Sequence, residues 1–251
     1  MSGPEIDATD AEARQASFAA MPSEIAILDD LILHINHGTA RLSGSSNDRG
    51  LNFLAMLLFC RAFGSLWRAR EDAVCGYPVQ SLTLCRAALE DWGTLLYVER
   101  HSETTNLWLQ DVLREVKPRG KPPRFKDIWI NLGDLGQKAD EAYGVLSLFS
   151  HPRSGGLPWL YDWDRDKVYF HTGGHFDRRN LEVCLYFLII VAQMLLERIA
   201  QLQLRVLGDA VSKWVERGNE ISSQAQAFVD RVHDETLQRL QTAGLSTTIR
   251  G

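Results

Sequence analysis

The sequence has few cysteines, and none of the four stands in a C-x-x-C pair that would bind a metal or exchange a disulfide. It also lacks a P-loop, a G-x-G-x-x-G turn, an H-E-x-x-H helix and a G-x-S-x-G elbow. These absences exclude the commonest motifs of nucleotide-binding proteins, dehydrogenases, zinc proteases and esterases. We therefore expect reduced thiols, no metal site and no cofactor.

Neither sign of charge dominates, since 27 basic and 32 acidic residues give a net charge of −5. A generally basic nucleic-acid-binding surface is therefore not indicated, which leaves a local basic patch as the alternative. Residues 1–22 lack the basic and apolar regions of a signal peptide. The longest apolar run, Val183 to Leu196, has fourteen residues and is shorter than the roughly 18 that a membrane span needs. We expect a cytoplasmic protein with no membrane segment.

Apolar residues recur at helical spacing through most of the chain. This pattern predicts helices over residues 23–40, 51–75, 78–100, 102–116, 139–150, 178–207 and 209–242, with a short glycine-broken helical stretch over 128–138. Aromatic clusters within residues 158–171 flank an Asp-Arg-Asp turn and indicate a hairpin. We expect an all-α bundle of about six or seven helices with one small β-hairpin.

The same pattern divides the chain into four parts. Residues 1–22 are expected to be a disordered lead-in, residues 23–208 the helical core domain, and residues 243–251 a disordered tail. Residues 209–242 form an amphipathic C-terminal helix, with a potential break at its Gly-Asn pair. The apolar stripe of this helix predicts a homodimer that forms through it, through the apolar run described above, or through both.

Two polar clusters are candidates for chemistry. Arg86 and Glu90 are one turn apart near the centre of an apolar helix face. Buried charges persist when they are paired, so they are either an internal ion pair or an arginine that Glu90 aims into a pocket.

Tyr143, Ser147 and His151 lie at four-residue intervals along one edge of a later helix. A proline after His151 ends that helix, and the helix dipole there favours a protonated imidazole. His151 is therefore a candidate general acid or phosphate ligand, the alternative being a histidine that satisfies the last helical carbonyls. Arg153 adds positive charge at the same place.

Residues 117–126 contain five basic residues and three prolines, which indicates a positively charged loop. Lys121 and Arg124 within it are candidate contacts for an anion or a nucleic acid, as is Arg153. The alternative is a solvated linker without a partner.

Together the two polar clusters resemble a widespread bacterial family of helical proteins labelled as a domain of unknown function. Its members carry R-x-x-x-E in one helix and Y-x-x-x-S-x-x-x-H downstream, and the resemblance covers roughly residues 50–155. This family is loosely similar to the HEPN superfamily, whose members include metal-independent ribonucleases of toxin–antitoxin and phage-defence systems.

The resemblance implies a HEPN-like, metal-independent endoribonuclease or defence effector. His151 would protonate the leaving oxygen, Arg86 would stabilise the phosphorane, and Glu90 would orient Arg86, while Tyr143 and Ser147 would position the scissile group. The alternative hypothesis is a non-catalytic helical module that binds a partner or a small anionic ligand. In that case the same residues form an internal structural network, and whether the chain is an enzyme stays open between the two.

Overall fold

The computed structural model describes residues 3–42, 50–106, 108–109, 123–150, 159, 161–164, 167–170 and 173–242. The helices are α1 (Gly3–Ala20), α2 (Pro22–Leu42), α3 (Leu51–Val74), α4 (Pro78–Arg100), α6 (Phe125–Asn131), α7 (Asp134–Ser150), α8 (Arg178–Leu207) and α9 (Ser212–Thr242). Short 3-10 turns η1 (Ser102–Thr104) and η3 (Gly208–Val211) follow α4 and α8. The prediction of an all-α bundle is confirmed.

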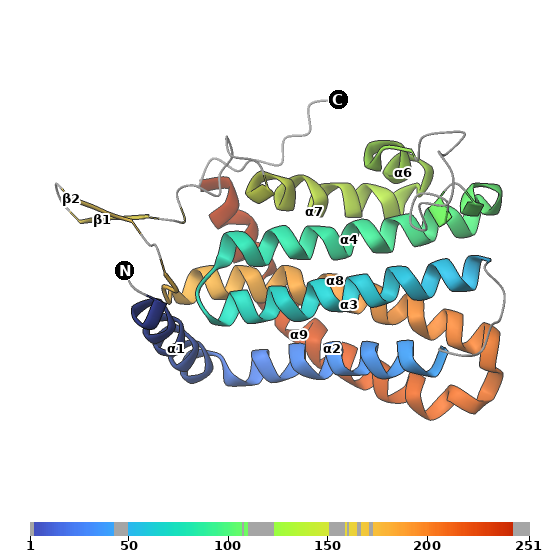
Figure 1. The fold of residues 1–251 in the computed structure, drawn as a ribbon, viewed down its shortest axis with the longest axis horizontal. Coiled ribbons are helices and arrows are strands. Elements are labelled where there is room, and N and C mark those ends of the chain that lie inside the picture. Colours follow the sequence, from blue (N-terminus) through green and yellow to red (C-terminus); the bar gives the residue numbers. More distant parts are fainter. Residues whose placement is uncertain are drawn as a thin grey trace.

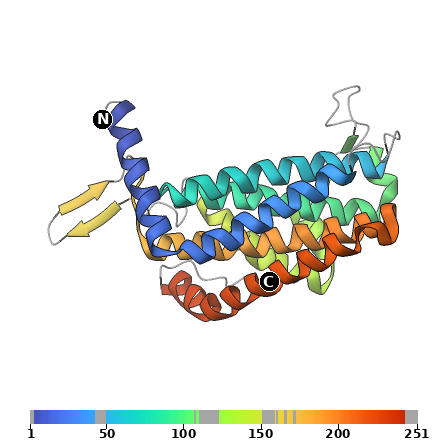
Figure 2. The same cartoon turned by 90° about the horizontal axis from the view of Figure 1, so that it is seen from below.

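Helices α2, α3, α4, α7 and α8 lie nearly parallel to one axis of the molecule, and α9 crosses behind them obliquely (Figure 1). Helices α3 and α4 form an antiparallel hairpin, α7 lies along α4, and α2 and α9 lie on the other side of α8. Two strands, β1 (Tyr161–Asp164) and β2 (Lys167–Phe170), pair antiparallel and project from the end of the bundle where α1 lies (Figure 2).

The turn between α3 and α4 requires a glycine. Gly76 has a φ of +81°, and a Cβ there would lie 2.4 Å from the carbonyl oxygen of His175. Pro78 then occupies the first turn of α4, where a missing N–H costs nothing. The sequence signals for this helical hairpin therefore have a direct structural cause.

Helix α8 is the central helix of the core, because other helices pack around most of its circumference. The stretch Arg178–Glu235 contains a window long and apolar enough to cross a membrane, but 67% of that window is buried inside the bundle. This burial is compatible with the core helix of a soluble protein.

Helix α9 folds back against α8 and α2, and its apolar stripe is buried there. Ile221, Ala225, Phe228 and Val232 are each at most 3% exposed. The stripe is therefore covered within the chain and no longer gives a reason to expect a homodimer. The helix also runs unbroken through Gly218, where a Cβ would lie 3.3 Å from the Nε2 atom of His34.

The prediction of a disordered lead-in over residues 1–22 is wrong, because α1 occupies Gly3–Ala20 and packs against the α3–α4 turn. The Ser17 hydroxyl donates to the carbonyl oxygen of Val74, and Asp10 accepts a hydrogen bond from the Tyr77 hydroxyl at 2.6 Å. Arg14 forms an ion pair with Glu71. Polar contacts fix this helix, so it lacks the apolar periodicity that reveals the other helices.

Other boundaries also differ from the predictions. The stretch predicted over 128–138 is the shorter α6, and Gly133, with a φ of +65°, separates it from α7. Of the helix predicted over 102–116, the structure describes η1 and the helical residues 105–106 and 108–109. The predicted tail, 243–251, lies outside the described residues.

Candidate functional site

Three of the predicted site residues meet where α4 packs against α7. The Arg86 guanidinium donates from Nε to the Glu90 carboxylate at 3.1 Å and from Nη2 to the Tyr143 hydroxyl at 2.7 Å. The Tyr143 hydroxyl in turn donates to the same Glu90 oxygen at 3.2 Å. A closed triangle of hydrogen bonds therefore joins the two helices.

Aromatic rings support this triangle. The Arg86 guanidinium carbon lies 4.7 Å from the centre of the Tyr143 ring, which places the cation over the ring's negative face. Phe125 and Trp129 of α6 both lie against Tyr143, with ring centres 5.8 and 5.6 Å away, and their own ring centres are 6.0 Å apart. Trp129 also lies against Gly93 of α4, where a Cβ would come within 2.3 Å of the indole. Helices α4, α6 and α7 are thus fixed around the cluster.

The cluster is partly exposed rather than internal. The side chains of Arg86 and Glu90 are 19% and 23% exposed, so the pair lies at a helix interface with access to water. Burial, followed by the nearby Glu90 charge, raises the pKa of Tyr143, which therefore stays protonated. Because the positive and negative charges are in contact, the cluster presents little net charge to a ligand.

The remaining predicted residues do not join this cluster in the described structure. Ser147 donates its hydroxyl to the Tyr143 carbonyl at 2.6 Å, a bond within α7. Arg124 precedes α6, is 88% exposed and faces Asp127. His151, Arg153 and Lys121 lie outside the described residues, as does most of the basic loop.

Asp91 is not among the predicted site residues, although it follows Glu90 directly. Its side chain is fully buried, and its Oδ1 atom accepts a 2.7 Å hydrogen bond from Nε of Arg61 on α3. Its Oδ2 atom has no hydrogen-bond partner among the described residues. Burial raises the pKa of Asp91 to about 6; Arg61 opposes this shift and Glu90 adds to it. Asp91 stands next to Glu90 in a helix that is buried on several sides. A second charge at such a position is the sequence signal that could have identified Asp91.

The second region is a groove of about 1050 Å³ between α7 and α9, with α8 as its floor. The floor is apolar and includes Phe187, Ile190 and Met194. Helices α7 and α9 contribute further apolar walls, with Ala142 and Val145 on α7 and Val215 and Val229 on α9.

The rim of this groove is polar and mainly acidic. Glu141, Glu197 and Asp230 line it, against one lysine, Lys138. At one end the Tyr186 hydroxyl lies 2.5 Å from Nδ1 of His233, and burial raises the pKa of this tyrosine to about 12. At the other end Leu204 remains 42% exposed.

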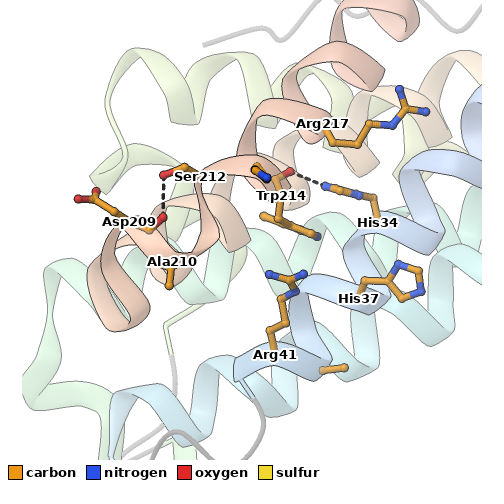
Figure 3. A pocket seen from close by; sticks show the side chains of 10 residues that line it. His34, His37, Arg41, Asp209, Ala210, Ser212, Trp214 and Arg217 are labelled. Atoms are coloured by element: carbon orange, nitrogen blue, oxygen red, sulfur yellow. Dashed lines mark hydrogen bonds between the residues drawn. The ribbon is translucent and has the colours of Figure 1, made fainter.

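The third region is an open pocket of about 830 Å³ between the end of α2, η3 and the start of α9 (Figure 3). Its lining is basic, with Arg41, Lys213 and Arg217, and includes His34 and His37. This pocket and the groove are separate from the Arg86 cluster, because neither lining includes a residue of that cluster.

Within the described residues, no three or more histidine, cysteine or acidic side chains are grouped to hold a metal ion. No family model matches the chain, and searches of curated proteins and of solved structures find no match. The function of the chain must therefore be inferred from the geometry of these three regions.

Proposed function

We propose that this protein is a non-catalytic helical module that binds a partner protein, and that the α7–α8–α9 groove receives an amphipathic α-helix of that partner. The observation that carries the proposal is the apolar α8 surface that remains open between α7 and α9, where Ile190 and Met194 are only half-buried. Recognition of an amphipathic helix by an apolar groove is a recurrent mode of protein binding.

The dimensions of the groove suit a helix. Tyr186 and Leu204 line its two ends and are 18 positions apart on α8, which corresponds to about 27 Å along the helix axis. Ligand sites for small molecules are shorter and more enclosed. An open, elongated groove instead accepts one face of a helix and leaves the other face in water.

The charge of the rim indicates which helix would bind. Three exposed carboxylates, from Glu141, Glu197 and Asp230, outnumber the single ammonium group of Lys138. Complementary charges steer association and select partners, so lysines or arginines along the edges of the bound helix are expected. A second copy of this chain is less suitable, because its net charge is −5.

In this proposal the motif residues have a positioning role. Tyr143 connects α7 to Arg86 and Glu90 of α4, while the other side of α7 presents Ala142 and Val145 to the groove. The polar triangle therefore fixes the wall of the groove and sets its width. This role requires a neutral, hydrogen-bonded cluster, as observed, and does not require a reactive group.

The test uses model peptides of roughly 18 residues with leucines at helical spacing on one face. One peptide carries lysines at its other positions and the other carries glutamates; both are labelled with fluorescein. We expect fluorescence anisotropy to give a Kd on the order of micromolar for the lysine peptide and at least about tenfold weaker binding of the glutamate peptide.

Four variants, in two matched pairs, locate the binding. Met194→Lys on the groove floor should abolish it, whereas Leu135→Lys, on the exposed side of α7 and outside the groove lining, should not change it. Glu141→Lys should weaken binding of the lysine peptide more than Glu103→Lys does, since Glu103 is an exposed acid away from the groove. Equal affinity for both peptides, or equal losses in both members of each pair, would disprove the proposal.

The ribonuclease hypothesis stays a second proposal, favoured by the meeting of Arg86, Glu90 and Tyr143. Structured RNA is incubated with the protein in EDTA, beside the His151→Ala and Arg86→Gln variants. Cleavage that only the wild-type protein performs would support a metal-independent nuclease. No cleavage by the wild-type protein would contradict this second proposal and would agree with the hydrogen bonds by which Glu90 and Tyr143 already engage the Arg86 guanidinium.

A further inference from the structure

Basic side chains from two helices line the seam between α2 and α9. His34, His37 and Arg41 lie on one face of α2, and Lys213 and Arg217 are one turn apart on α9. The two helices run antiparallel (Figure 1). The two rows of basic groups therefore face the same pocket.

Few acidic groups neutralise this pocket. Arg217 faces Glu220 at 3.0 Å and Asp30 at 3.8 Å. Arg41 and Lys213, in contrast, form no ion pair within the described part of the chain. Asp209 is the acidic residue of the lining, and Figure 3 shows its carboxylate turned away from the Arg41 guanidinium.

The scaffold beneath these groups is closely packed. The His34 ring stacks on Trp214, with ring centres 4.3 Å apart and an angle of 5°, and its Nε2 atom lies 2.8 Å from the Trp214 carbonyl oxygen. Since a carbonyl only accepts, Nε2 carries the proton. Trp214 lies directly on Gly38, where a Cβ would be 2.4 Å from the indole.

A buried amide also fixes the α2 backbone. Gln203 of α8, which is fully buried, donates to the Gly38 carbonyl at 2.7 Å. Three helices therefore hold the backbone of the seam in one geometry, which fixes the positions from which Arg41 and Lys213 extend. Such preorganisation reduces the cost of ordering the site upon binding.

The electrostatic effect of the cations is visible at His34. Burial lowers the pKa of His34, the Trp214 carbonyl opposes this shift, and His37, Arg217 and Arg41 lower the pKa further. Like charges that face one another in this way destabilise the fold unless an anion lies between them.

We propose that this pocket binds a phosphorylated small molecule, with Arg41 and Lys213 as the main phosphate contacts and His37 as a further donor. Arginine matches phosphate with two parallel hydrogen bonds, and lysine contributes a compact charge. The pocket of about 830 Å³ exceeds what a lone phosphate needs, which leaves room for the organic part of the ligand. This site is independent of the proposed helix-binding groove.

The probe is inorganic pyrophosphate, titrated into the full chain by calorimetry at constant ionic strength. We expect saturable binding to the wild-type protein and a Kd at least about tenfold weaker in Arg41→Gln and in Lys213→Gln. The matched control is Arg179→Gln, which removes the same charge from an exposed position at the start of α8, outside the pocket lining. It should bind as the wild-type protein does.

A second measurement separates lost binding from lost folding. Without ligand, Arg41→Gln and Lys213→Gln should unfold at a temperature no lower than the wild type does, because both residues are exposed and each change removes one of the like charges. Pyrophosphate should shift the imidazole NMR signal of His37, assigned by its loss in His37→Gln, and the shift should be absent in Arg41→Gln. No saturable binding by the wild-type protein, or an equal loss in Arg179→Gln, would overturn the proposal.

Discussion

Helix α4 and the α2–α9 seam differ in whether their charged side chains are paired. On α4, the consecutive acids Glu90 and Asp91 each hold an arginine, Arg86 on the same helix and Arg61 on α3. On the seam, Arg41 and Lys213 face one pocket without an acidic partner in the described structure. Paired charges are what helix packing tolerates, whereas unpaired like charges cost stability without a ligand.

The difference indicates which region connects neighbouring helices and which is available to a ligand. Through Arg61–Asp91 and Arg86–Tyr143, the polar groups of α4 reach α3 on one side and α7 on the other. On the seam, Arg217 of α9 reaches Asp30 of α2, but Arg41 and Lys213 form no such bridge, and backbone and aromatic contacts also join α2 to α9 in the described structure. Mutations in the two regions should therefore differ in what they change.

The largest effect is expected at Gly38, where α2 touches Trp214. A Cβ there would lie 2.4 Å from the indole and 2.7 Å from Ile199, so Gly38→Val must displace packed side chains on two helices. We expect a loss of about 3 kcal/mol in the free energy of unfolding, measured by urea denaturation. Pyrophosphate binding should be lost together with the stability.

The matched control is Gly64→Ala on α3, since a Cβ at Gly64 meets no atom within 4 Å. This change should stabilise the helix by about 0.5–1 kcal/mol, because alanine is the better helix former. If Gly38→Val were as harmless as Gly64→Ala, α2 and α9 would not be in contact as described.

The next largest effect concerns Asp91, whose folded pKa is about 6 against an ordinary value of 3.8. The folded protein binds this proton more tightly than the unfolded chain, so the stability contributed at Asp91 falls as pH rises from about 4 to 6. Above that pH range the Asp91 carboxylate is ionised, and its burial lowers the stability of the fold by the full amount. We expect Asp91→Asn to raise stability by about 1–2 kcal/mol at pH 7.5.

The pH dependence provides the check. The gain from Asp91→Asn should shrink as the pH is lowered through 6 towards 4, because the wild-type carboxyl then becomes neutral as well. Urea midpoints at several pH values measure this convergence. A variant that is less stable than the wild type at pH 7.5 would instead mean that the Arg61–Asp91 attraction exceeds the cost of burial.

Much of the fold can be predicted from apolar periodicity. The pattern predicts helix α8 at its observed bounds, because its buried face and Gly208 at its end both leave clear sequence signals. The same pattern misses helix α1 for a physical reason: alanine, serine and charged residues make its contacts, including Arg14 with Glu71. Helices fixed by polar contacts do not show a stripe of large apolar residues.

The candidate sites are less predictable, because they depend on which helices become neighbours. Four-residue spacing places Arg86 beside Glu90, but it cannot tell that Tyr143 completes the triangle from 53 residues beyond Glu90. The basic seam joins Arg41 to Lys213, which are far apart in the chain. Contacts between distant helices leave no periodic signal in a single sequence.

A smaller effect is expected for Tyr143→Phe in the α4–α7 cluster. The change removes two hydrogen bonds, from Arg86 and to Glu90, but those two residues keep their own contact and partial access to water. We expect a loss of about 1 kcal/mol in the free energy of unfolding. Binding of the lysine peptide should weaken by a few-fold, since the α7 wall of the groove becomes less fixed. Unchanged peptide binding would show that the cluster does not position the groove.

The smallest effect is expected for Ser147→Ala, and it separates the positioning and catalytic roles of this helix. The Ser147 hydroxyl donates to the Tyr143 carbonyl within α7, and that carbonyl is already placed to accept a helical hydrogen bond. Removing the hydroxyl should change stability by no more than about 0.5 kcal/mol, because alanine's higher helix propensity offsets the lost bond. Peptide and pyrophosphate binding should both be unchanged. If RNA cleavage were found in the wild-type protein and lost in Ser147→Ala at unchanged stability, Ser147 would contact the substrate, and the cluster on α7 would be catalytic rather than structural.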